Sequence, residues 1–220
     1  MLTLTNIKKT FNSGTVNERL ALNNLNLTLS DGDFVTVIGG NGAGKSTLLN
    51  LIAGVFPPDD GESSILLDSI NMTNMPEFKR AAYLGRVFQD PMLGTASDMG
   101  IDENLSIAMR RGKRRTLKWQ ITPSETAFFE KSLKALDLGL ENCLTQKVGL
   151  LSGGQRQALS LLMSTLQKPR LLLLDEHTAA LAPKTAKKVL ELTQSMVHSN
   201  NITTLMVTHN MLDAIKLGNR

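Results

Sequence analysis

The chain has 220 residues, of which 41% are hydrophobic and 20% charged, a globular composition whose length fits one domain or one domain with an inserted subdomain. Its net charge is +4, and Cys143 is its single cysteine, which excludes an intrachain disulfide and favours a reducing compartment. No apolar run approaches the roughly 20 residues of a membrane span, and the N-terminus lacks a signal-peptide core, so we do not expect the chain to cross a membrane by itself.

The first ninety residues are predicted to be mainly β. Polar and apolar residues alternate over Leu2–Thr5 and Leu25–Leu29, as in half-buried strands, and the apolar run Phe34–Ile38 suits a buried strand. Glycines follow that run, and the chain then takes on the pattern of a helix. We predict strands at 2–5, 25–29, 34–38, 65–67 and 84–88, and a helix at 45–53.

The pattern changes between Pro91 and Leu150, where leucine and phenylalanine recur at helical spacing. That stretch is predicted to be an inserted helical subdomain. Beyond it, strands alternate with helices, which implies a parallel sheet covered on both faces. We predict helices at 103–110, 124–136, 154–166, 184–198 and 211–217, and strands at 171–174 and 203–208.

A glycine-rich segment after the strand at 34–38 matches the phosphate-loop pattern GxxxxGK followed by Ser or Thr. Glycines let the backbone approach phosphate closely, and the N-terminus of the following helix favours an anion. Lys45 is expected to reach the terminal phosphates, and the Ser46 hydroxyl to bind Mg²⁺. A simple glycine-rich turn is the alternative, which the strand before and the helix after make the weaker interpretation. The residues expected to hold ATP are Gly39, Asn41, Gly42, Ala43, Gly44, Lys45, Ser46 and Thr47.

Two carboxylates follow the leucine run at 171–174, at the strand edge where open α/β sheets bind ligands. Asp175 is placed to hold Mg²⁺, directly or through water. Glu176, one residue on, is placed to orient or deprotonate the water that attacks the γ-phosphate. The pair can also simply open a loop, but the phosphate loop upstream favours the catalytic interpretation.

The segment Leu151–Gln155 reads Leu-Ser-Gly-Gly-Gln and stands at the start of a predicted helix. Ser152 can cap that helix, with Gln155 three residues later as in a capping box. Capping does not account for the adjacent Gly153 and Gly154. Glycines at a helix start cost stability, unless another group must approach the backbone closely there. A second glycine-backed anion site, formed by Ser152, Gly153, Gly154 and Gln155, is the functional interpretation.

With this motif the sequence resembles the ATP-binding-cassette (ABC) ATPases over nearly its whole length. Twenty positions separate Gln155 from Asp175 and 34 separate Asp175 from His209, which agrees with the family's order and spacing. The resemblance implies that Gln89 contacts Mg²⁺ and the attacking water, and that His209 contacts the γ-phosphate. It also implies that Phe11 stacks on adenine, although a Phe in the core or in a loop is nearly as good an interpretation.

The implied fold is α/β, a P-loop NTPase core with a parallel sheet, an N-terminal antiparallel β subdomain and an inserted helical subdomain. We expect a single ABC ATPase domain over 1–220, with the β subdomain and core at 1–90 and 160–220 and the helical subdomain, including the signature motif, at 91–159.

The family's mechanism implies a homodimer of cassettes packed head to tail, in which the signature motif of one copy contacts the γ-phosphate on the phosphate loop of the other. ATP hydrolysis would drive a separate membrane permease, placing the chain peripherally on the cytoplasmic face of the cell membrane. Residues 85–91, 175–181 and 208–210 resemble a bacterial importer subgroup that works with extracytoplasmic substrate-binding proteins, some of whose members are linked to aromatic amino acids. The sequence does not name the cargo.

Two departures from the family pattern stand out. Ala182 occupies the position of an aspartate that helps couple the two ATP sites, and an alanine side chain accepts no hydrogen bond. We therefore expect intact ATP binding with weakened coupling or turnover. Relatives also continue for a few dozen residues beyond the position of Arg220, so one edge of the core is expected to be under-covered.

An alternative function is that of an ABC-type ATPase acting in translation or DNA repair. The translation type carries two cassettes in one chain, and the repair type separates its motifs by a long coiled coil, so neither fits well. The basic run Arg110–Lys118 suits nucleic acid, lipid headgroups or a permease rim, but a solvated surface is its simplest interpretation. Nucleic acid is not expected as a partner. A scaffold without hydrolysis is disfavoured by the presence of both Glu176 and His209.

Overall fold

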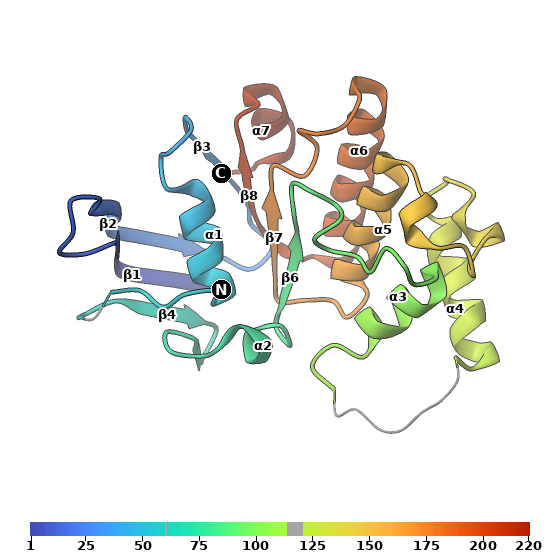
Figure 1. The fold of residues 1–220 in the computed structure, drawn as a ribbon, viewed down its shortest axis with the longest axis horizontal. Helices are drawn as coiled ribbons and strands as arrows, with labels where there is room; N and C mark the ends of the chain where they lie inside the picture. The colour runs from blue at the N-terminus through green and yellow to red at the C-terminus, as the bar shows by residue number, and fades with distance from the viewer. Residues whose placement is uncertain (60, 114–120) are drawn as a thin grey trace.

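Two four-stranded sheets organise the chain, and helices pack between and beside them (Figure 1). The structure is a computed structural model that describes residues 1–59, 61–113 and 121–220. The basic run that begins at Arg110 is therefore described only as far as Lys113, and the rest of it lies outside the described residues.

The first sheet is antiparallel, with strand order β2-β1-β4-β5. In β1, Leu2 and Leu4 point into the core, and a register shift between Leu4 and Ile7 then buries Ile7 as well. Asn6, within that shift, has a φ of 50°, a left-handed conformation that suits a β-bulge. The strands of this sheet are β1 (Leu2–Phe11), β2 (Arg19–Leu29), β4 (Ser64–Leu67) and β5 (Ile70–Asn71).

The second sheet is parallel, with strand order β3-β8-β7-β6. One of its two central strands, β7, has four consecutive leucines that are fully buried, because helices cover both faces of a parallel sheet. The carboxyl ends of all four strands therefore lie at one edge of this sheet. The strands are β3 (Phe34–Ile38), β6 (Leu84–Val87), β7 (Leu171–Asp175) and β8 (Thr203–Thr208).

Helix α1 (Lys45–Ala53) lies between the two sheets (Figure 1). Leu49, Leu51 and Ile52 of this helix belong to one apolar cluster that also contains β1 and β4 residues from the antiparallel sheet and Leu173 from the parallel sheet. The short helix α2 (Glu77–Arg80) precedes β6. This shared core fixes α1, and with it the glycine-rich loop, against both sheets.

A buried arginine closes the C-terminal end of α1. The Nη1 group of Arg80 donates to the carbonyls of Leu51 and Ile52, at 2.8 Å each, and its Nε donates to the carbonyl of Met75 at 2.7 Å. Burial lowers the Arg80 pKa to about 10, so the side chain is charged at neutral pH. A cation at this position satisfies the last carbonyls of the helix and complements its dipole.

The helices after β6 build a second apolar cluster, whose buried members include Leu105, Phe129, Leu133 and Leu159. Helix α4 begins with a capping box between Thr122 and Glu125. The elements of this part are α3 (Ile101–Met109), α4 (Pro123–Lys134), the 3-10 turns η1 (Leu140–Asn142) and η2 (Val148–Leu150), and α5 (Gly153–Thr165).

Helices α6 (Pro183–Asn200) and α7 (Met211–Leu217) complete the fold. Leu190 and Val197 of α6 and Leu217 of α7 pack in a third apolar cluster that also includes β7 and β8 residues. In the part of the chain that the structure describes, no helix is both long and apolar enough to span a bilayer.

The predicted fold class is confirmed: the chain combines an antiparallel β subdomain with a parallel sheet in an α/β fold. The bounds predicted for β3, α1, β8 and α7 agree with the structure, whereas β1 and β2 are longer than predicted. Their hairpin pairing continues to Phe11 and Arg19, through residues that are exposed or only half-buried and whose hydrophobic alternation is weak. The short elements β5, α2, η1 and η2 were not predicted from the sequence.

Candidate active site

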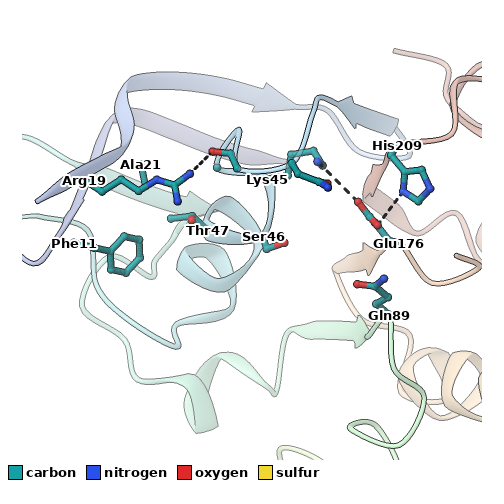
Figure 2. Close-up of a pocket in the computed structure, with 12 residues that line it drawn as sticks. Phe11, Arg19, Ala21, Lys45, Ser46, Thr47, Gln89, Glu176 and His209 are labelled. Atoms are coloured by element: carbon teal, nitrogen blue, oxygen red, sulfur yellow. Dashed lines mark hydrogen bonds and ion pairs between the residues drawn. The ribbon is translucent and has the colours of Figure 1, made fainter. Parts of the chain in front are cut away.

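The carboxyl ends of the four parallel strands bring the predicted site residues together. The phosphate loop follows β3, Gln89 follows β6, Glu176 follows β7 and His209 follows β8. Residues from all four strand ends line one cavity of about 710 Å³ (Figure 2). The lining residues are Phe11, Arg19, Ala21, Asn41, Gly42, Gly44, Lys45, Ser46, Thr47, Gln89, Glu176 and His209.

The phosphate loop wraps the N-terminus of α1 in a conformation that requires glycine. Gly42 and Gly44 have φ values of 82° and 84°, and a Cβ on Gly44 would lie 2.6 Å from the carbonyl oxygen of Ala21 in β2. Gly44 is the N-cap of α1 and supplies no side-chain acceptor to the first turn. The backbone N–H groups at this helix start can therefore bind an anion.

A chain of polar contacts crosses the cavity from Lys45 to His209 (Figure 2). Lys45 Nζ lies 3.9 Å from Glu176 Oε1, and His209 Nδ1 lies 3.0 Å from Glu176 Oε2. Lys45 also donates to the carbonyls of Gly39 and Gly40 at 2.7 and 3.0 Å. Glu176 itself has a φ of 41°, a strained conformation of the kind that concentrates at functional sites.

Asp175 lies at the end of β7 and is not among the described residues that line this cavity. Its side chain is 16% exposed, and Arg86 Nη2 lies 3.8 Å from its Oδ2 atom. Burial raises the Asp175 pKa above its ordinary value, while the positive charge of Arg86 opposes that shift.

The antiparallel sheet contributes the other end of the cavity. Phe11 lines it and packs edge-on against Phe56, with ring centroids 5.3 Å apart. Arg19 and Ala21 also line it, and Arg19 Nη2 donates to the carbonyl of Gly42 at 2.7 Å (Figure 2). Sequence reasoning missed Arg19, although its pairing opposite Phe11 in the β1–β2 ladder follows once the hairpin register is known.

The signature residues Ser152, Gly153, Gly154 and Gln155 lie at the start of α5 and are not among the described residues lining the cavity. Ser152 and Gln155 form the predicted capping box. Further along α5, Gln157 donates to the carbonyl of Phe88, next to Gln89, at 2.9 Å. This bond ties the signature helix to the segment that carries Gln89. Gln157 had not been singled out from the sequence.

The two signature glycines differ in their surroundings. A Cβ on Gly154 would lie 1.9 Å from Thr185 Cγ2 of α6, whereas a Cβ on Gly153 would lie 3.6 Å from its nearest neighbour, Leu181. A glycine is therefore needed at position 154 because Thr185 of the same chain lies so close to it. Gly153, in contrast, has space beside it.

We expect Gly154→Ala to destabilise the chain by about 1–3 kcal/mol, because the Thr185 side chain must rotate or α5 and α6 must move apart to admit the methyl group. Gly153→Ala is the matched control and should change the stability by less than about 1 kcal/mol. Urea unfolding of both variants measures the difference. Equal stabilities would show that the contact between α5 and α6 gives way without cost.

Ala182 occupies the N-cap of α6, directly before Pro183. An alanine leaves the N–H groups of the first helical turn without a side-chain acceptor at the cap. Reverting Ala182→Asp should therefore stabilise the chain by about 1 kcal/mol, apart from any effect on coupling between ATP sites. Urea unfolding at low protein concentration, without nucleotide, tests this expectation. Ala182→Leu adds bulk without an acceptor, and an equal gain in that variant would contradict capping.

His177 follows Glu176 and is fully buried against α6. Thr193 Oγ1 donates to the carbonyl of Val189 at 2.8 Å, so it accepts from His177 Nε2–H, 3.1 Å away. Burial lowers the His177 pKa to about 4, from 6.5 for a free side chain.

Because the unfolded chain binds a proton at His177 that the folded chain excludes, this residue should make stability fall as the pH drops below about 6.5. The expected loss between pH 7 and pH 5 is about 2 kcal/mol. Urea unfolding at both pH values measures it. His177→Gln, which is neutral throughout, should flatten the profile by that amount, and an unchanged profile would exclude His177 as its source.

The side chains around the cavity fit a magnesium ion. Mg²⁺ prefers oxygen ligands and is usually held by one or two side chains together with substrate phosphates. The Ser46 hydroxyl in the first turn of α1, the Asp175 carboxylate at the end of β7 and the Gln89 amide just after β6 are such donors. Among the described residues there is no cluster of three or more His, Cys, Asp or Glu side chains that could hold a metal ion by themselves.

A phosphate loop after β3, Glu176 after β7 and His209 after β8 line one cavity, and Asp175 ends β7 beside Glu176; this arrangement is that of a P-loop ATPase. A family model of ABC transporters matches residues 22–179. The chain belongs to this family, and it is an ATP-binding and ATP-hydrolysing subunit of the ABC type.

Individual relatives agree with this assignment. The chain is 48% identical over 220 residues to a tyrosine transport ATP-binding protein of Clostridioides difficile, covering all of this chain and 86% of that protein. It is 35% identical to the spermidine/putrescine import ATP-binding protein PotA of Haemophilus influenzae, covering all of this chain and 54% of PotA. These relatives are named for transport, which favours the transporter over the translation or DNA-repair alternative.

Solved structures place the fold in the same family. The dimeric post-hydrolysis ATP-binding cassette MJ0796 bound to ADP and Pi matches with a TM-score of 0.82 at 29% identity, over 99% of this chain and 91% of that chain. A second dimeric structure of MJ0796, described as a bacterial ABC transporter cassette, matches with a TM-score of 0.80 at 28% identity, over the same shares of the two chains.

Proposed function

We propose that the chain hydrolyses MgATP at a site completed by a second copy, and that it thereby drives import through a membrane permease. The cavity that unites Lys45, Glu176 and His209 carries the hydrolytic part of this proposal. Glu176 orients and deprotonates the water, and His209, hydrogen-bonded to it, contacts the γ-phosphate. When ATP binds, the Lys45 ammonium group exchanges its hydrogen bonds to the carbonyls of Gly39 and Gly40 for contacts with the terminal phosphates. Gly39 and Ala43 shape the loop, and Phe11 and Arg19 border the base and ribose end.

Ser46, Gln89 and Asp175 would hold Mg²⁺, which supplies charge neutralisation for the phosphate oxygens. Ser152, Gly153, Gly154 and Gln155 of the second copy would close the other side of the γ-phosphate. This arrangement is supported by two observations: these residues do not line the cavity of their own chain within its described part, and the matched cassette structures are dimeric. The helical part at 91–159 would then serve to present the signature motif.

An apolar groove beside Gln89 suits a permease. Phe88, Leu93 and Ile107 line a cavity of about 340 Å³ between β6 and α3. Leu93 is 70% exposed, and Phe78, which follows the groove-lining Glu77 on α2, is 74% exposed, so large apolar side chains reach solvent in and next to this groove. A cytoplasmic segment of a permease would cover them and hold the chain at the inner face of the membrane, with an extracytoplasmic binding protein delivering the cargo.

Tyrosine, or another aromatic amino acid, is the proposed cargo, because the 48% identical relative is named for tyrosine transport. Uptake of labelled tyrosine by cells that carry the intact chain, compared with cells that carry Lys45→Ala, tests this. Uptake should depend on the intact chain. If labelled tyrosine uptake is equal while uptake of a labelled polyamine or thiamine is lost, the cargo assignment is wrong and the importer assignment stands. If none of the three depends on the intact chain, the proposed importer role fails for these cargos.

A further inference from the structure

Arg86 connects the apolar groove to the carboxylate of Asp175. It lies on β6, where it pairs with Leu173 of β7, and its side chain lines the groove. Its Nη2 group donates to Asn50 Oδ1 at 2.7 Å and lies 3.8 Å from Asp175 Oδ2. Its guanidinium carbon lies 4.5 Å from the centre of the Phe88 ring. The arginine is therefore held by α1 on one side and by an aromatic ring on another.

The two neighbouring carboxylates have different cationic partners. Glu176 faces Lys45 and His209, which line the nucleotide cavity and are free to turn to phosphate. Asp175 faces Arg86, which belongs to the groove and is anchored away from the cavity. The positive charge beside Asp175 is therefore held by Asn50 and Phe88, outside the nucleotide cavity that Lys45 and His209 line.

A guanidinium so close to a metal-binding carboxylate must affect cation binding. The side chains of Arg86 and Asp175 are 14% and 16% exposed, so solvent ions screen their interaction less than they would at the surface. A divalent cation bound to the Asp175 carboxylate would compete with the Arg86 guanidinium for the same negative charge. The two positive charges would also repel each other.

We propose that Arg86 is a positioning residue that weakens the affinity of Asp175 for the divalent cation, so that the cation is retained only together with the nucleotide's phosphates. The inference rests on the proposed role of Asp175 in holding Mg²⁺. According to this proposal, the affinity of the site for the divalent cation depends on Arg86, a groove-lining residue outside the sequence motifs.

The test measures how much a divalent cation tightens nucleotide binding. The affinity of the purified chain for a fluorescent ADP analogue is determined in EDTA and in Mn²⁺, which serves as the stand-in for Mg²⁺. The ratio of the two dissociation constants reports cation binding at the site. In Arg86→Met, which keeps the apolar stem but removes the charge, this ratio should rise about ten-fold, while the affinity in EDTA stays at the parental value.

Arg86→Lys keeps the positive charge and should leave the ratio near the parental value. Arg86→Gln, which is neutral but can still donate to Asn50, should behave like Arg86→Met and replaces it if that variant unfolds in urea more readily than the parent. An unchanged or lowered ratio in the neutral variants overturns the proposal, since Arg86 would then be structural or would assist the cation.

Asp175→Asn separates this inference from the proposed function on which it rests. That variant should lose most of the cation-dependent tightening. If it keeps the parental ratio, Asp175 does not hold the cation and the metal assignment itself fails. If it loses the tightening while the Arg86 variants do not differ from the parent, the metal assignment stands and the role of Arg86 is refuted.

Discussion

Replacing Glu176 by glutamine is expected to lower ATP hydrolysis by about 10²- to 10⁴-fold while ATP binding is kept. Glutamine has the same shape, but it cannot accept a proton from the attacking water. The substitution also removes the negative charge that faces Lys45 and His209 across the cavity. Phosphate release from MgATP measures the loss, and light scattering should detect an ATP-bound dimer that accumulates because hydrolysis no longer separates the copies.

Glu191→Gln is a matched control for this prediction, because it makes the same change at an exposed position on α6. It should hydrolyse ATP at the parental rate. Parental hydrolysis by Glu176→Gln would show that Glu176 is not the general base, whatever its place in the cavity.

Lys45→Ala is expected to weaken ATP binding by about 100-fold or more. Lys45 is 8% exposed and lies at the start of α1, so it carries a desolvated positive charge to the place where the terminal phosphates bind. Titration with a fluorescent ATP analogue measures the loss, and Lys131→Ala, an exposed lysine on α4, is the control.

Lys45 also donates to the carbonyls of Gly39 and Gly40, so part of the effect can come from a loosened loop. Lys45→Arg keeps a donor and a charge, and its urea midpoint and ATP affinity separate the two causes. ATP binding at the parental affinity in Lys45→Ala would remove the phosphate-loop assignment.

Local sequence patterns predicted the elements that carry the site. The buried run Phe34–Ile38 and the glycine-to-lysine loop after it gave the bounds of β3 and α1 correctly, because burial and a required backbone conformation both leave a strong local signal. The motif positions Gln89, Glu176 and His209 could be placed at strand ends for the same reason. The structure brings them to one cavity, and their individual roles remain predictions.

Residues that act through tertiary contacts were not found from the sequence. Arg19 reaches the phosphate loop because β2 pairs with β1 in one particular register, and Arg86 reaches Asp175 because β6 lies beside β7. Neither contact can be predicted from the residues that neighbour Arg19 or Arg86 in the sequence. Likewise, the close approach that Gly154 needs comes from Thr185 on α6, which is 31 positions away in the chain.

The central claim is that each ATP site is shared between two copies, with the phosphate loop from one and the signature motif from the other. Site-directed cross-linking tests it most directly. In a Cys143→Ser, Glu176→Gln background, one batch of the chain carries Asn41→Cys and a second batch carries Ser152→Cys. Asn41 lines the ATP cavity, and Ser152 begins the signature helix outside it.

After the two batches are mixed with ATP and oxidised, the account predicts a disulfide-linked dimer that forms only in the mixture and only when ATP is present. Equal cross-linking without ATP, or none in a mixture shown by light scattering to be dimeric, would contradict it.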